Sequence, residues 1–181
     1  MTRTVLLGVG GGIAAYKACF LASRLVQKGV AVRAVMSAGA QQYVGALTFE
    51  GLTGQKAIVS PTQVDPDGSP PHIAAAKAAD LYIVAPATAG VLARLAAGAA
   101  DDAVSLLALT CRCPLLLCPA MNDAMWLAAA TRDNVARIAA RGAHFLGPVE
   151  GRLAEGYDAI GRMVEPEAIL ARALDLLGVS S

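Results

Sequence analysis

The sequence has 181 residues, which suits one domain with a substantial buried core and requires no second domain. The 15 basic and 14 acidic residues nearly cancel, so neither a general nucleic-acid binder nor a membrane binder is expected. Hydrophobic residues make up 56% of the chain, and such an apolar composition predicts that copies bury surface against each other in a homo-oligomer.

Strands and helices alternate along the chain, the strands as short apolar runs and the helices as apolar residues at helical spacing. In chain order, the first half predicts a strand at 4–9, a helix at 13–27, a strand at 30–36, a helix at 38–44, a short strand at 57–59 and a mobile loop at 60–71. The second half predicts a helix at 72–79, a strand at 81–85, helices at 87–95 and 102–110, a strand at 114–118, a helix at 128–141, a strand at 143–146, a loop at 147–165 and a helix at 166–177.

The predicted strands are continuously apolar, which indicates a parallel sheet covered on both faces. The sequence therefore predicts a single α/β domain over 1–181, a three-layer sandwich with a Rossmann-like, flavodoxin-like parallel sheet. No membrane span is expected, because the longest apolar stretch, 104–118, contains Arg112 and Pro114. The N-terminus lacks the pattern of a secretory signal, so a cytoplasmic protein is expected.

The cysteines fit neither a disulfide framework nor a zinc site, because Cys111 and Cys113 have no second pair to complete a tetrahedron. Reduced, mostly buried thiols and no metal site are expected, and this applies to Cys19 and Cys118 as well.

A glycine-rich turn, Gly8-Val9-Gly10-Gly11-Gly12, follows the first predicted strand. Such a turn places backbone N–H groups at a helix N-terminus, where they can bind a phosphate, although glycine turns also occur there for steric reasons alone. No Gly-Lys-Ser/Thr follows, so the turn is not a Walker loop. Ser37 ends the second strand where a dinucleotide fold needs an acidic residue, and FMN therefore fits better than NAD.

Further candidate residues lie where predicted strands end or helices begin. His72 starts a helix after the mobile loop and is either a catalytic base or a surface residue, whereas His144 is expected to be structural. The run Pro86-Ala87-Thr88-Ala89-Gly90 leaves a strand with small residues, as a planar ring against the backbone requires. Asp102 begins a helix, so it either caps that helix or contributes to a site.

The stretch Pro119-Ala120-Met121-Asn122-Asp123-Ala124-Met125-Trp126 contains the only tryptophan of the chain, together with an amide and two thioethers. It follows a predicted buried strand, so its side chains are expected at the carboxyl end of the sheet. Core packing alone would account for such a cluster. The same groups could also hold a flat ligand and orient a small polar group.

These segments occur together, in this order, in one known family, the homo-oligomeric flavin-containing cysteine decarboxylases. Residues 119–126 resemble the Pro-x-Met-Asn-x-x-Met-Trp signature of that family at every specified position. Gly11-Gly12-Ile13-Ala14-Ala15-Tyr16-Lys17 resembles its flavin-phosphate turn, and Pro71-His72-Ile73 resembles its catalytic-histidine segment. Pro86-Ala87-Thr88-Ala89 resembles its flavin-ring loop, so the resemblance covers nearly the whole chain.

The resemblance implies an assembly built from trimers, commonly a dodecamer, with FMN held at subunit contacts. It implies a substrate cysteine with a free carboxylate, with His72 as the base and Asn122 holding the substrate carboxylate or amide. The cofactor-binding residues it points to are Gly11, Gly12, Ile13, Ser37, Pro86, Ala87, Thr88, Ala89, Asp102 and Met121. The substrate-binding residues it points to, besides Asn122, are Met125, Trp126, Glu155 and Met163.

The segment 147–165 resembles the substrate flap of the coenzyme A enzymes of this family at Glu150-Gly151 and at Gly161-Arg162-Met163. Those enzymes carry Ala-Cys-Gly in the flap, and the cysteine gives a proton to the ene-thiol formed by decarboxylation. This chain has Ala154-Glu155-Gly156 instead, so that thiol is missing. Gly90 also replaces the asparagine that the family usually has beside the flavin ring.

The missing thiol favours oxidative decarboxylation of the C-terminal cysteine of a precursor peptide, which releases an aminoenethiol in peptide natural-product maturation. The alternative is phosphopantothenoylcysteine decarboxylase of coenzyme A biosynthesis. A non-catalytic, flavin-holding regulatory subunit is a third hypothesis, and the presence of His72 and Asn122 argues against it. A prenyl-flavin synthase fits less well, because the histidine and the full signature belong to the cysteine branch.

Overall fold

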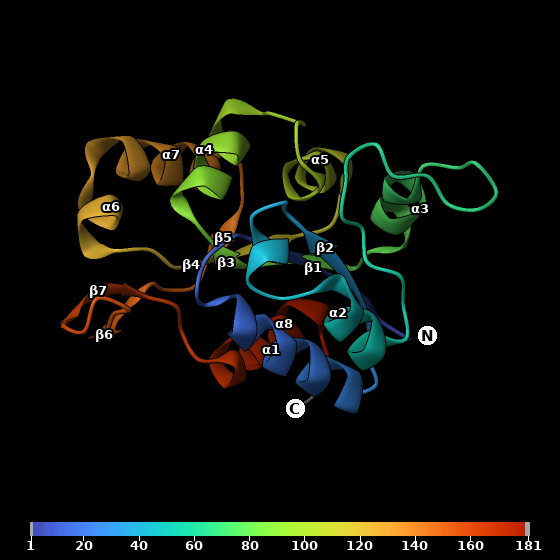
Figure 1. Ribbon diagram of the computed structural model, residues 1–181, viewed down its shortest axis with the longest axis horizontal. Coiled ribbons are helices and arrows are strands. Elements are labelled where there is room, and N and C mark those ends of the chain that lie inside the picture. The colour runs from blue at the N-terminus through green and yellow to red at the C-terminus, as the bar shows by residue number, and fades with distance from the viewer. Residues whose placement is uncertain (1, 180–181) are drawn as a thin grey trace.

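Five short, mostly apolar runs form the strands of the main sheet. The strands are β1 (Thr4–Val9), β2 (Ala31–Met36), β3 (Leu81–Ala87), β4 (Leu115–Pro119) and β5 (His144–Phe145). All neighbouring strands pair in parallel, in the order β2-β1-β3-β4-β5, in the computed structural model, which describes residues 2–179 (Figure 1). This is the flavodoxin-like strand order, and the predicted fold class is confirmed.

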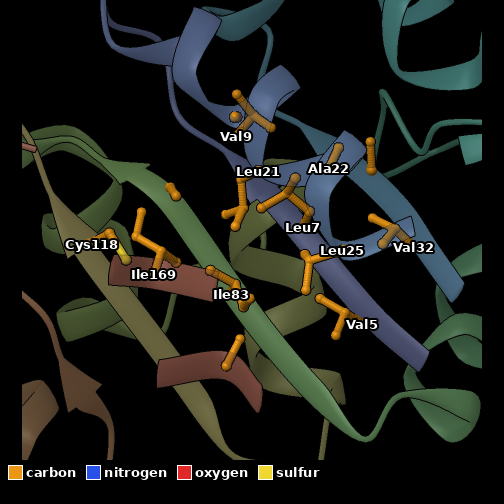
Figure 2. Packing of buried hydrophobic residues seen from close by; sticks show 14 of the residues in the cluster. Val5, Leu7, Val9, Leu21, Ala22, Leu25, Val32, Ile83, Cys118 and Ile169 are labelled. Atoms are coloured by element: carbon orange, nitrogen blue, oxygen red, sulfur yellow. The ribbon is translucent and has the colours of Figure 1, made fainter. Parts of the chain in front are cut away.

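The central strands β1, β3 and β4 are almost entirely apolar because successive side chains enter two different cores. In β1, Val5 and Leu7 belong to one buried cluster, whereas Leu6 between them belongs to the other. Figure 2 shows the first cluster, in which side chains of β1 and β3 meet those of helices α1 (Ala15–Gln27) and α8 (Pro166–Leu177). Burial on both faces explains why β1, β3 and β4 contain no charged residue, whereas the edge strand β2 contains Arg33.

Helices cover both faces of the sheet. One face is covered by α1 (Ala15–Gln27) and α8 (Pro166–Leu177), with α2 (Ala46–Thr53) packed on α1. The other face is covered by α3 (Pro71–Ala78), α4 (Ala89–Ala97), α5 (Ala103–Thr110) and α7 (Ala129–Ala140). Figure 1 shows the sheet between these two layers, which makes the predicted three-layer sandwich. Most predicted elements lie within two residues of the observed bounds.

Two helices were not predicted from the sequence. In α2 only Phe49 is buried, so the segment lacks the repeated apolar positions that indicate a helix. Helix α6 (Asp123–Leu127) has five residues and none is buried. The helix predicted at 38–44 is wrong in extent, because only the 3₁₀ turn η1 (Ala40–Gln42) forms there.

Two other segments also differ from the prediction. Of the strand predicted at 57–59, only Ile58 pairs, in an isolated bridge with Val35. The loop predicted at 147–165 contains an antiparallel hairpin of β6 (Val149–Arg152) and β7 (Asp158–Arg162). The hairpin is largely solvent-exposed and rich in charged residues and glycine, so it lacks the alternation of apolar and polar residues that would have predicted it.

The cysteines are free thiols, with Cys118 buried and the other three half-buried. A hydrogen bond from Cys111 to the sulfur of Cys113 raises the pKa of Cys111 and lowers that of Cys113. Across residues 2–179, no helix is both long and apolar enough to cross a membrane.

Candidate active site

The carboxyl ends of β1, β3 and β4 open into one cleft of about 640 Å³. Its walls are the turn after β1, Thr88 after β3, the segment from Ala120 to Met125 after β4, and the hairpin β6–β7. In a parallel α/β sheet the carboxyl ends of the strands share one edge, which is where ligands bind in this strand order. The cleft therefore lies where the topology predicts a site.

Close backbone contacts explain the glycines of the turn after β1. The Gly10 N–H donates a hydrogen bond to the Pro86 carbonyl oxygen at 3.0 Å, and a β-carbon on Gly10 would lie 2.4 Å from that oxygen. A β-carbon on Gly11 would lie 2.7 Å from the carbonyl carbon of Gly39. Glycine thus lets the loops after β1, β2 and β3 meet at one corner of the cleft.

Helix α1 begins at this corner, and its N-terminus suits an anion. The residues from Gly11 to Ala14 and Lys17 line the cleft, and the first turn of α1 contains no acidic residue. Backbone N–H groups and the helix dipole both favour a negative charge there. Ser37 is buried at the end of β2, and its hydroxyl oxygen accepts a hydrogen bond from the Ala40 N–H at 3.1 Å.

The side chain of Asn122 joins the end of β4 to the hairpin. Its Oδ1 accepts a hydrogen bond from the Ala124 N–H at 2.9 Å, which caps α6 and fixes the orientation of the amide. Its Nδ2 donates to the Tyr157 hydroxyl at 2.9 Å and to Glu155 Oε1 at 3.2 Å. The Tyr157 hydroxyl donates in turn to Asp123 Oδ1 at 2.6 Å. The hydrogen bond to Asp123 raises the pKa of Tyr157, so the phenol stays neutral.

A second contact, through the backbone, holds the hairpin against the cleft. The Met121 N–H donates to the Gly161 carbonyl oxygen at 3.0 Å. Gly161 is buried with φ +139°, and a β-carbon there would lie 2.2 Å from the Met121 carbonyl oxygen. Only glycine allows β7 to approach the end of β4 this closely.

We expect Gly161→Ala to detach the hairpin without unfolding the domain. Backbone hydrogen exchange in residues 149–162 should accelerate by at least about tenfold, which corresponds to ~1.4 kcal/mol, because the β-carbon clashes with Met121. Gly45→Ala is the matched control, since Gly45 has open space around it and φ −71°. Unchanged exchange in the Gly161 variant would contradict the tight contact described here.

Three basic and two acidic side chains line the cleft. Lys17 Nζ lies 2.9 Å from Glu165 Oε1, and Arg162 pairs with the same carboxylate. These two contacts lower the pKa of Glu165. Arg152 also lines the cleft, and within residues 2–179 no carboxylate lies within 4.0 Å of its guanidinium. The cleft therefore suits an anionic ligand.

The structure brings together many of the site residues proposed from the sequence. Those that line the cleft are Gly11, Gly12, Ile13, Thr88, Met121, Asn122, Met125, Glu155 and Met163. Pro86 and Ala87 lie buried under the glycine turn, and Trp126 packs half-buried against the core beside α7. Asp102 caps α5, accepting a hydrogen bond from the Ser105 N–H at 2.8 Å, and pairs with Arg94.

His72 lies apart from these residues in the same chain. It is half-buried in the first turn of α3 and does not line the cleft. Figure 1 places α3 at one end of the molecule and α6 with the β6–β7 hairpin at the other. A single copy therefore does not bring His72 to Asn122.

Roles for Tyr157, Arg152 and Tyr43 were not predicted from the sequence, although all three residues belong to this region. The register of the hairpin brings the Tyr157 hydroxyl to Asn122 and places Arg152 in the lining of the same cleft. Tyr43 follows η1, where no motif marks it. Only a hairpin predicted over 149–162 would have located Tyr157 and Arg152 at the cleft.

Comparison with known proteins gives consistent matches over the whole chain. A family model described as Flavoprotein matches residues 1–178. The coenzyme A biosynthesis bifunctional protein CoaBC of Mycobacterium tuberculosis H37Rv is 46% identical over 176 residues, 97% of this chain and 41% of that protein. CoaBC of Vibrio parahaemolyticus is 41% identical over 166 residues, 91% of this chain and 41% of that protein. The chain thus spans about 41% of the length of these relatives.

Two solved structures share the fold over nearly their full length. A cysteine-to-serine variant of a PPC decarboxylase, complexed with pantothenoylaminoethenethiol, superposes with a TM-score of 0.83 at 25% identity, covering 96% of this chain and 97% of that chain. The FMN-dependent cysteine decarboxylase SpaF superposes with a TM-score of 0.83 at 29% identity, covering 99% of this chain and 98% of that chain.

Proposed function

The chain belongs to the flavoprotein family, and we propose that it is an FMN-dependent phosphopantothenoylcysteine decarboxylase that serves coenzyme A biosynthesis. The observation that carries the proposal is the 46% identity to CoaBC over 97% of this chain. SpaF, an FMN-dependent cysteine decarboxylase, is only 29% identical. The comparisons therefore favour phosphopantothenoylcysteine over the peptide substrate that the missing flap thiol suggested.

The residues at the cleft fit FMN. The turn from Gly11 to Ile13 presents backbone to a phosphate at the N-terminus of α1, and the first turn of α1 contains no acidic residue. Thr88 and Met121 offer small and thioether groups to a flat ring. Bound FMN supplies the removal and the return of two electrons at the substrate Cβ–S unit.

The cleft also fits the two anionic ends of phosphopantothenoylcysteine. The Asn122 amide presents N–H groups that can hold the cysteine carboxylate. Arg152 supplies a cation that has no carboxylate of the described residues within 4.0 Å, which suits the substrate phosphate. Because a peptide that ends in cysteine carries the carboxylate but no phosphate, Arg152 favours the phosphorylated substrate.

Assembly of copies completes the proposed site. A band of exposed apolar side chains runs from the rim of the cleft along α1 to α2, formed by Ile13, Tyr16, Phe20, Tyr43 and Leu47. The rings of Tyr16 and Phe20 pack edge to face, with centroids 6.3 Å apart. A second copy covering this band would bury it and would bring a further surface to the cleft. His72 of one copy can then act in the same site as Asn122 of another copy.

Leu47→Asp is expected to reduce the oligomer to smaller species, because a buried unpaired carboxylate at an apolar contact is costly. Leu47 is 79% exposed in the single chain. Val64→Asp is the control, since Val64 is 65% exposed but lies outside the apolar band. Light scattering after size-exclusion chromatography measures the mass of each variant. An unchanged mass for the Leu47 variant would exclude this band as the contact.

The preference of the protein between two substrates tests the proposed function. The purified protein is offered phosphopantothenoylcysteine and, separately, peptides that end in cysteine, and kcat/KM is compared. We expect a preference for phosphopantothenoylcysteine of at least about 10²-fold, because the peptides leave Arg152 without an anionic partner. Arg152→Ala should remove most of this preference. A higher kcat/KM for the peptides would replace the proposal with the oxidative peptide reaction.

A further inference from the structure

The flap carboxylate already occupies the amide that we propose for the substrate carboxylate. Glu155 Oε1 lies 3.2 Å from Asn122 Nδ2, and the Tyr157 hydroxyl takes up the other interaction of this amide at 2.9 Å. A substrate carboxylate that binds to Asn122 therefore arrives beside Glu155. The inference drawn from this juxtaposition rests on the proposed function, which makes Asn122 the carboxylate-binding residue.

We propose that Glu155 takes up a proton when the substrate binds and gives that proton to the substrate carbon from which carbon dioxide departs. Glu155 then performs the step for which this flap has no cysteine. Glu155 is thus a catalytic residue, whereas Tyr157 is a positioning residue that holds the Asn122 amide through its hydroxyl.

Electrostatics supports the proton uptake. Two carboxylates that share one amide repel each other, and a proton taken up by one of them removes most of that repulsion. The other groups around Glu155 have opposing effects. Asp123 adds negative charge behind the neutral Tyr157, while Arg152 on β6 adds positive charge on the cleft side. Asn122 contributes only its N–H donors, which both carboxylates seek.

The stoichiometry of the proposed reaction requires this proton. The Cα–carboxylate bond breaks, carbon dioxide leaves, and the electron pair stays with the substrate as an ene-thiolate. A C–H bond then forms at Cα with the proton from Glu155, and bound FMN would supply the return of two electrons to Cβ. The net change consumes one proton for each carboxylate lost.

Departure of carbon dioxide also makes Glu155 a better acid at the moment the proton is needed. Once the substrate carboxylate has gone, no neighbouring charge from the substrate opposes ionisation of Glu155. The carboxylate that remains can return to Asn122, as in the structure. In the oxidative peptide reaction, by contrast, the ene-thiol leaves without a new C–H bond and needs no such donor.

Proton uptake on binding provides a test that does not depend on turnover. The FMN-loaded oligomer is titrated with phosphopantothenoylserine, which lacks the sulfur to be oxidised, in buffers of different ionisation enthalpy. Calorimetry should show uptake of about one proton per site for the wild type near neutral pH and about none for Glu155→Gln. Asp158→Asn is the matched control and should keep the uptake, because Asp158 is an exposed flap carboxylate outside the cleft lining.

Product identity provides the second test. With phosphopantothenoylcysteine, Glu155→Gln should release carbon dioxide but leave the ene-thiol as its main product. Glu155→Cys should restore the saturated thiol, because a thiol at this position can give the proton. Retention of bound FMN by both variants shows that they are folded.

The outcomes separate this inference from the proposed function. If the wild type fails to decarboxylate phosphopantothenoylcysteine, the proposed function is wrong. If the wild type forms the saturated thiol and Glu155→Gln forms it at the same rate with the same proton uptake, the assignment of Glu155 alone is overturned.

Discussion

His72→Asn should lower the rate of phosphopantothenoylcysteine decarboxylation by about 10²–10⁴-fold, because a positioned general base contributes that much to a proton transfer. FMN should stay bound, since His72 does not line the cleft of its own chain. Turnover and flavin absorbance of the purified variant measure the two effects. His144→Asn is the matched control, because His144 is the other histidine and lies in β5, away from the cleft.

Full activity of the His72→Asn variant would show that His72 is not part of the active site. Loss of both FMN and activity would instead indicate a structural role. The variant should keep the oligomeric mass of the wild type, which separates a missing base from a failed assembly.

Mixed oligomers of His72→Asn and Asn122→Ala chains should regain activity that neither variant has alone. The structure separates His72 from Asn122 within one chain, so an active site needs an intact His72 from one copy and an intact Asn122 from another. In a random one-to-one mixture, about a quarter of the sites combine the two intact residues, and the rate should approach that fraction of the wild-type rate. Coexpression of the two variants with different tags, followed by tandem purification, yields the mixed oligomers for assay.

Mixing the Leu47→Asp forms of the same two variants provides the control, because the apolar band is then disrupted and no rescue is expected. Absence of rescue in the mixed oligomers with intact Leu47 would contradict a site shared between copies.

The fold could be predicted from the sequence because both faces of the sheet are buried. Runs such as 4–9 and 81–85 contain no polar interruption, and the alternation of strands with helices leaves few arrangements. Elements that bury little apolar surface were not predicted, because the prediction depends on a pattern of buried apolar residues. Helix α6 has no buried residue, and the hairpin β6–β7 is mostly exposed, so neither leaves a hydrophobic pattern.

The site could be predicted in part. The turn from Gly11 to Ile13 and the segment at Asn122 both follow apolar strands, and the parallel topology brings them to one cleft. The separation of His72 from Asn122 does not follow from the order of motifs, because it depends on which end of the sheet α3 covers. The contact of Glu155 with Asn122 depends on the hairpin register.

The missing thiol favoured the peptide reaction because the sequence offers no other thiol in the flap as a proton donor at neutral pH. A glutamate in a solvated loop is ionised at neutral pH and makes a poor proton donor. In the structure the same glutamate lies on Asn122, where an arriving substrate carboxylate would favour its protonation. The identity of a flap residue is therefore less informative than the group it contacts.

Repeated turnover without oxygen tests the central proposal most directly. A redox-neutral decarboxylase returns the two electrons to its substrate, so it needs no external oxidant. In an anaerobic mixture with phosphopantothenoylcysteine in large excess, mass spectrometry should show complete conversion to a product that has lost carbon dioxide alone. A reaction that stops after one equivalent of ene-thiol per bound FMN, and resumes only when oxygen is admitted, would contradict the proposal.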